Sequence, residues 1–199
     1  MDIRPGRTLS SSWKTASIAV LAVFAAAGWL FVALGVYNVA ADVPHTKPVH
    51  WLFNEVRRRS IAVRSRAIQL PSNLADPTRI SAGASLYAKM CSGCHLAPGM
   101  EKTEISQGLY PAAPELSHTR DLTPSEEFWI IKHGVKMSGM AAWGKTHSDT
   151  LIWDMVAFLQ KLPGLTPAQY QALVKSAPED HDEIMKNMNG MPDMDRDHH

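Results

Sequence analysis

The sequence has few cysteines and little net charge, and one long segment in its first quarter contains no charged residue of either sign. Only two cysteines, Cys91 and Cys94, occur in the 199 residues. A structural zinc site would therefore need further ligands of other types at matched spacing. The formal net charge is only +1, and we expect no nucleic-acid partner. From Thr15 to Ala41 no residue is charged, and an uncharged stretch of this length indicates a membrane segment.

The two cysteines stand in the stretch Cys91-Ser92-Gly93-Cys94-His95. A pair of cysteines two residues apart, followed at once by histidine, is typical of covalent haem attachment. A thioredoxin-like dithiol would not need the histidine. The stretch predicts one haem c, held through thioethers at Cys91 and Cys94 with His95 as the proximal axial ligand.

The uncharged segment predicts a transmembrane helix over residues 16–41, because about 20 apolar residues cross a bilayer core. Arg4, Arg7 and Lys14 precede it, which favours an amino terminus in the cytoplasm and export of everything after it. A cleaved signal peptide ending near Val39-Ala40-Ala41 is the alternative, but its apolar region would be shorter. We expect a single-pass protein of a bacterial cytoplasmic membrane, with the haem in the periplasm.

Residues 42–77 form the expected connector, with a helix from about Val49 to Ile68 after Pro44 and Pro48. Its apolar residues alternate irregularly with Arg57, Arg58, Arg59, Arg64 and Arg66. The basic side could face lipid headgroups, an acidic partner subunit or only solvent.

Three helices are expected in the haem domain, residues 78–164. Apolar residues at helical spacing lead into Cys91 with Gly83 among them, and a glycine there suggests a close approach by another helix. The sequence Thr123-Pro124-Ser125-Glu126 is a capping box, and the helix that it begins should end at Gly134. A last helix should follow Ser148 and end before Pro163-Gly164.

This order of features resembles a class I cytochrome c over residues 78–162. The similar positions are Gly83, Tyr87, the Cys91–His95 stretch, Gly139-Met140-Ala141-Ala142-Trp143 and Met155-Val156-Ala157-Phe158-Leu159. The resemblance implies an all-α fold in which the first and last helices cross at Gly83 and Tyr87 against Phe158. It also implies Met140 as distal ligand, although Ala141 stands where the family usually has proline. A proline carbonyl should accept the second ring N–H of His95, and Pro114 fits this place, with Pro111 as the alternative.

The distal ligand can also be argued from chemistry. A thioether is soft, suits ferrous iron and raises the reduction potential relative to a second imidazole, which favours Met140. Met137 lies three residues earlier and is the main alternative, whereas Met100 is too close to His95. Less favoured nitrogen ligands are His118, His133 and His147.

Between Leu96 and Leu122 the apolar residues show no period, so we expect a long loop for which haem supplies the core. The side chains expected around the haem are Leu96, Leu109, Tyr110, Leu116 and Trp143.

The carboxyl-terminal part divides into a short helix in residues 165–177, opened by Thr166-Pro167, and an acidic tail in residues 178–199. The tail has too little apolar surface to fold alone. Its methionines recur every three residues, at Met185, Met188, Met191 and Met194, which suggests a Cu(I) site. A disordered solubilising tail with incidental methionines is the alternative.

These features predict a membrane-tethered electron carrier, not an enzyme. It would pass single electrons from a respiratory donor to a terminal oxidase or reductase, either as a separate carrier or as a subunit of that complex, with both axial positions of the iron filled. A haem enzyme would need an open distal position, and a copper-handling protein would depend on the tail. The expected organisation is 1–15 cytoplasmic, 16–41 anchor, 42–77 connector, 78–164 haem domain, 165–177 helix and 178–199 tail.

Overall fold

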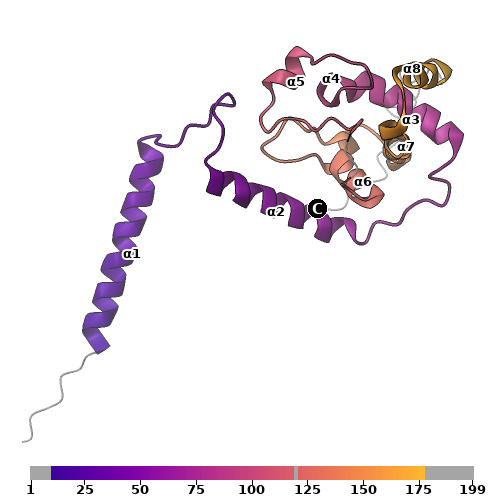
Figure 1. Cartoon of the computed structure of the whole chain (residues 1–199). Coiled ribbons are helices and arrows are strands. Elements are labelled where there is room, and N and C mark those ends of the chain that lie inside the picture. The colour runs from indigo at the N-terminus through magenta and orange to yellow at the C-terminus, as the bar shows by residue number, and fades with distance from the viewer. Residues whose placement is uncertain (1–9, 119–120, 178–199) are drawn as a thin grey trace, which may run out of the picture. The chain divides into compact units, whose positions relative to one another are not determined.

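A computed structural model of the chain describes residues 10–118 and 121–177. Every regular element within these ranges is helical, as the sequence predicts (Figure 1). Contacts divide the chain into two units, Met1–Val43 and Pro44–His199. The first unit holds the uncharged segment, and the second holds both the connector and the haem domain.

The first unit contains α1, Ser10–Ala33. The part Trp13–Ala33 is long and apolar enough to cross a membrane, and every one of its side chains is exposed. The helix begins and ends earlier than the expected span 16–41. It stops before Gly35, whose φ of 59° is a left-handed conformation that few other residues adopt at low cost.

The connector helix α2, Lys47–Ser65, packs on the haem domain. Pro48 occupies its first turn, where a missing N–H costs nothing. Ile61 and Ser65 are buried on the side that contacts α6, Pro124–His133. Beyond the helix, Ser125 Oγ donates to the Ile68 carbonyl at 3.3 Å.

The core of the haem domain is the crossing of α3, Pro77–Met90, with α7, Asp149–Leu159 (Figure 1). A Cβ on Gly83 would overlap the backbone carbonyl of Asp154 and would lie 2.8 Å from Phe158 Cβ. The rings of Tyr87 and Phe158 lie 5.3 Å apart. The predicted close approach at Gly83 is therefore present, and α3 holds the Cys91 end of the site against α7.

The caps predicted for the helices are also present. Thr123 and Glu126 form the capping box of α6, Gly134 is its C-cap, and the Ser148 side chain caps α7. A further capping box at Thr166 begins α8, Pro167–Ser176, which packs on α3.

The expected loop 96–122 is not wholly irregular. It contains α5, Glu104–Gly108, a helix too short for any apolar period. The remaining short elements are α4, Ser92–His95, and the single turns η1, Trp143–Lys145, and η2, Leu162–Gly164.

Candidate haem-binding site

The Cys91–His95 stretch directly follows α3 and is tied down by three side-chain hydrogen bonds. Ser92 Oγ donates to the Ala88 carbonyl at 2.7 Å, Thr103 Oγ1 to the Gly93 carbonyl and Tyr87 OH to the Leu96 carbonyl. Leu96, with a φ of 58°, ends α4 immediately after His95. The two cysteines and the histidine are thus held on one rigid turn.

His95 has one ring nitrogen engaged and the other available. Its Nδ1 lies 2.8 Å from the Pro114 carbonyl oxygen, which is the contact expected from the resemblance. Burial lowers the pKa of His95, while the Pro114 carbonyl acts in the opposite direction. A neutral imidazole that donates from Nδ1 presents a lone pair at Nε2, and no described residue forms a hydrogen bond with that atom.

Cys91 and Cys94 are half-buried and not joined in a disulfide. Burial raises the pKa of the Cys91 thiol to about 12, and Cys94 adds to the rise. Cys91 packs on both apolar clusters of the domain. Its surroundings therefore favour an uncharged sulfur, as in a thiol or a thioether.

Met140 is held by the tight loop 134–142 after α6. The Val135 N–H donates to the Met140 carbonyl at 3.2 Å, and the Met140 N–H donates to Ser138 Oγ at the same distance. A Cβ on Gly134 would lie 2.7 Å from the Met140 carbonyl, and its φ of 66° also favours glycine. This loop places Met140, half-buried, against the buried cluster around Phe128, on which Trp143 also packs.

Met137 is in a different environment. Its side chain is 73% exposed and its φ is 59°. A ligand inside a haem pocket has to lie on the protected side of its loop, and of the two methionines Met140 satisfies this condition.

The other expected pocket residues lie on the segments around the site. A Cβ on Gly139 would lie 2.5 Å from Leu109 Cδ2, so the 109 loop and the Met140 loop pack directly on each other. Leu96 is buried, and Leu116 packs on the cluster around Tyr87.

Tyr110 makes a contact with His45 that no sequence pattern predicts. Its hydroxyl accepts a hydrogen bond from the His45 N–H at 2.8 Å, and the two rings lie 5.2 Å apart. Nothing in the spacing of residues so far apart could have indicated this pair. Thr103 was also missed, because the capping box that it forms with Ser106 lacks the usual Glu or Gln.

The less favoured ligand candidates make other contacts. His118 is exposed next to Glu115, His133 lies beside Trp129, and His147 is buried against Trp143. Met100 is 39% exposed. Within the described ranges no group of three or more His, Cys, Asp or Glu could hold a metal ion. The copper site predicted at Met185, Met188, Met191 and Met194 lies outside the described residues.

Comparison with known families agrees with this geometry. Residues 78–159 match the family model described as cytochrome c oxidase, cbb3-type, subunit III. No curated protein and no solved structure gives a significant match. The matched residues include the Cys91–His95 stretch and Met140, and they define a monohaem class I c-type cytochrome domain.

The residues present fit a covalent haem c. The available Nε2 of His95, the two unpaired cysteines beside it and the half-buried thioether of Met140 are the donors and attachment points that such a group needs. The domain is accordingly a haem protein with an electron-transfer role.

Proposed function

We propose that this chain is a membrane-tethered cytochrome c that carries single electrons on the periplasmic side of a bacterial cytoplasmic membrane. The observation that carries the proposal is the His95 ring, oriented by the Pro114 carbonyl with Nε2 unpaired, in a domain that matches a cytochrome c model. Haem c would supply a one-electron iron couple at neutral pH.

The chain's own residues would hold and insulate that group. Cys91 and Cys94 would attach it, and His95 and Met140 would supply the two protein ligands of its iron. The Pro114 carbonyl fixes the rotation of the His95 ring and makes the imidazole a stronger donor. If His95 and Met140 both bound the iron, no site would remain there for a substrate, which is why we propose an electron carrier and not an enzyme.

The tether is α1. Its exposed apolar side chains from Trp13 to Ala33 have the length needed to span a bilayer. The basic residues Arg4, Arg7 and Lys14 favour an amino terminus in the cytoplasm. The arginines of α2 lie beyond the roughly 15–20 residues over which positive charge biases the orientation of a membrane helix.

The partner that we propose as acceptor is a terminal oxidase or reductase. The matching family model is that of an oxidase subunit. A tether raises the concentration of the haem domain near membrane-bound partners, so the domain need not diffuse through the periplasm to find them.

The proposal can be tested in membranes that contain the haem-loaded chain. The absorbance of its haem should change from reduced to oxidised when oxygen is admitted, and back when a respiratory substrate is supplied and oxygen is exhausted. The isolated protein should titrate as a one-electron couple and should not consume peroxide. A haem that stays reduced under oxygen, or that turns over peroxide rapidly, would contradict the proposal.

A further inference from the structure

The outer side of α2 carries an apolar stripe that has no partner within the described residues. We define this outer stripe as Leu52, Val56 and Val63, which are 50%, 58% and 57% exposed. Their spacing of four and seven residues places them on one face of the helix. Each residue of an α-helix is rotated by about 100° from the one before it. The outer stripe therefore lies about 180° around the helix axis from Ile61 and Ser65, which α6 covers. The helix therefore has two apolar sides, and the haem domain uses only one of them.

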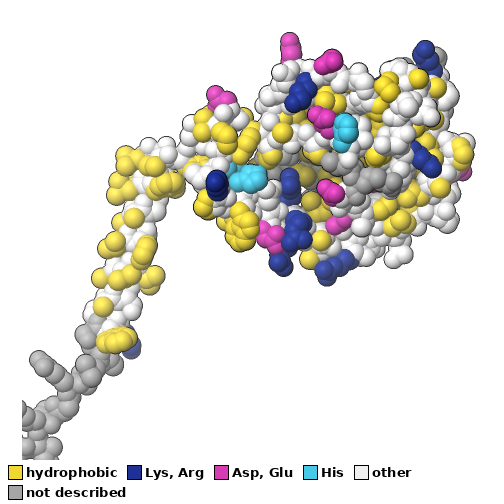
Figure 2. Space-filling view, in the orientation of Figure 1, with side chains coloured by type: hydrophobic (Ala, Val, Ile, Leu, Met, Phe, Trp, Pro, Cys, Tyr) yellow, Lys and Arg dark blue, Asp and Glu magenta, His cyan; other side chains and the backbone are white. Residues whose placement is uncertain are grey.

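Arginines lie on both sides of the outer stripe, one next to it and two farther round the helix, towards the side that α6 covers. Arg59 lies about 40° from the stripe on one side, and Arg57 and Arg64 lie about 110° from it on the other. Figure 2 shows basic side chains interleaved with apolar ones along α2. Long arginine side chains can lie along an apolar surface and extend their charged ends towards anions at its edge.

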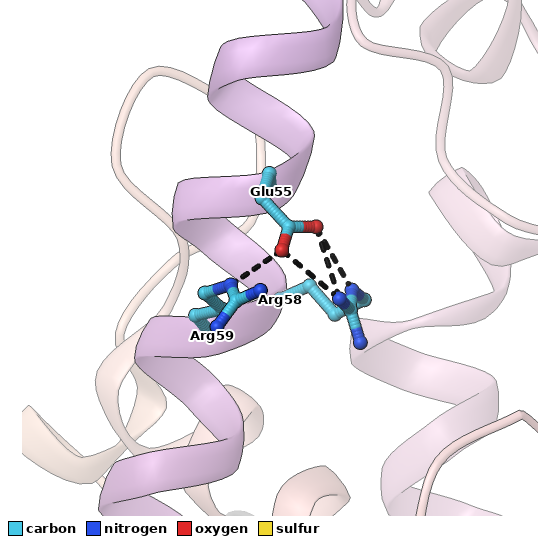
Figure 3. Close-up of polar contacts among 3 residues, drawn as sticks. All are labelled: Glu55, Arg58 and Arg59. Carbon is cyan, nitrogen blue, oxygen red and sulfur yellow. Dashed lines mark hydrogen bonds and ion pairs between the residues drawn. The ribbon is translucent and has the colours of Figure 1, made fainter.

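The charges of α2 are only partly neutralised within the helix. Glu55 is its one acidic residue, and it pairs with both Arg58 and Arg59 (Figure 3). Arg57 donates to the neutral Asn54 side chain, and Arg64 donates to Ser60. The surface around the stripe thus has an excess of positive charge that an anionic partner would match.

A bilayer is within reach of this surface. Residues 34–46 join the end of α1 to the start of α2 and can span at most about 45 Å. If α1 spans the membrane, as proposed above, α2 is held at high local concentration next to lipid headgroups. An apolar stripe with basic borders is the pattern of a helix that lies in the plane of a membrane surface.

We propose that the outer stripe of α2 docks on the surface of the bilayer, with Arg57, Arg59 and Arg64 against anionic lipid headgroups. Because the opposite side of α2 packs on α6, docking would fix the orientation of the haem domain to the membrane and not only its distance. The inference rests on the proposed tether and adds to it a second, reversible membrane contact.

The test uses the full haem-loaded chain in lipid nanodiscs, with a nitroxide attached at Val56→Cys. Cys91 and Cys94 would be consumed by the haem, so the new thiol alone would react. The matched control is Gln171→Cys on the exposed side of α8. Discs contain phosphatidylcholine alone or an equimolar mixture with phosphatidylglycerol. The collision rates of the label with oxygen, which partitions into lipid, and with a water-soluble nickel chelate are compared with the haem kept oxidised. Each rate is measured against a nitrogen-equilibrated sample without chelate, which carries the constant contribution of the ferric iron.

In the mixed discs we expect the Val56 label to favour oxygen and the Gln171 label to favour the chelate. The preference at Val56 should weaken in phosphatidylcholine alone. Replacement of Arg57, Arg59 and Arg64 by glutamine should lower the docked-to-free ratio about fivefold per arginine, from the attraction of each basic residue to an anionic surface.

Three results would overturn the inference. The Val56 label could be as accessible to the chelate as the Gln171 label in mixed discs. It could be protected only when two chains share a disc, whatever the lipid, which would assign the stripe to a second copy. It could be protected only in native membranes, which would assign it to a protein partner. A chain that fails to enter the discs would remove the tether as well, whereas redox titration of the same samples reports on electron transfer separately.

Discussion

At the scale of single residues, the turn that carries the haem ligands depends on Tyr87. Its side chain is 1% exposed and its hydroxyl donates to the Leu96 carbonyl. Tyr87→Phe would leave that buried carbonyl without its partner, so we expect a loss of about 1–2 kcal/mol in the free energy of unfolding. Urea unfolding of the oxidised holoprotein measures it. Tyr170→Phe is the matched control, since this buried tyrosine makes no side-chain hydrogen bond among the described residues; an equal loss in both variants would contradict the role given to the hydroxyl.

Asp154 gives a residue-level prediction for pH. It is paired with Arg79 at 2.6 Å, yet burial raises its pKa above the ordinary value of 3.8, and Arg79 offsets only part of that rise. Asp154 thus has a higher pKa in the folded state than in the unfolded state. In the pH range between these two values the folded state binds more protons, so the free energy of unfolding decreases as the pH rises through this range. The stability of the wild type relative to Asp154→Asn should therefore decrease from below pH 3.8 upwards and then level off. Urea titrations across acidic pH measure the difference, and an increase with pH would show that Arg79 outweighs burial.

At the scale of elements, the crossing of α3 and α7 is the contact on which the domain is built. Gly83→Ala would place a Cβ against the backbone of Asp154, which no change of rotamer can relieve. We expect a net loss of about 2 kcal/mol or more in stability, despite the better helix propensity of alanine. Gly108→Ala is the control, because an added Cβ there meets nothing within 4 Å. Thermal unfolding of both variants measures the two changes in stability. An unchanged stability in Gly83→Ala would contradict the prediction, because it would mean that α3 and α7 can move apart at little cost.

The same elements show what local sequence can and cannot specify. The helices α6, α7 and α8 begin at capping residues that are readable in the sequence, because a cap depends only on neighbours three residues away. The crossing at Gly83 was predictable because a glycine inside a helix needs a reason. The short helix α5 was not, since five residues carry no period.

At the scale of the whole molecule, a membrane-tethered electron carrier has to stay attached to its anchor. We expect protein from membranes to retain α1, as judged by intact mass spectrometry, and to remain in the membrane pellet after an alkaline wash. Fusion of residues 42–199 to a cleavable signal peptide should release the domain as soluble protein with an unchanged haem spectrum. Mature protein that begins at Asp42 would show instead that the segment is a signal peptide.

Contacts between distant parts of the chain are what the sequence could not provide. The attachment stretch with His95 was predicted from its motif, whereas Met140 and the His95–Pro114 contact were predicted from family resemblance, with thioether chemistry as a second argument for Met140. The packing of α2 on α6 and the hydrogen bond from His45 to Tyr110 join segments whose own patterns carry no information about each other. These contacts attach the connector to the haem domain.

We propose that Met140 binds the haem iron, leaves no open coordination position and so makes the domain an electron carrier. This proposal is tested most directly by the absorption spectrum of the oxidised protein, in the weak sulfur-to-iron charge-transfer band of His/Met haem. The wild type should show this band, Met140→Leu should lose it and bind cyanide quickly, and Met137→Leu, with its exposed side chain, should keep it. A wild type that lacks the band and binds cyanide at once would contradict the account, because its distal position would be open.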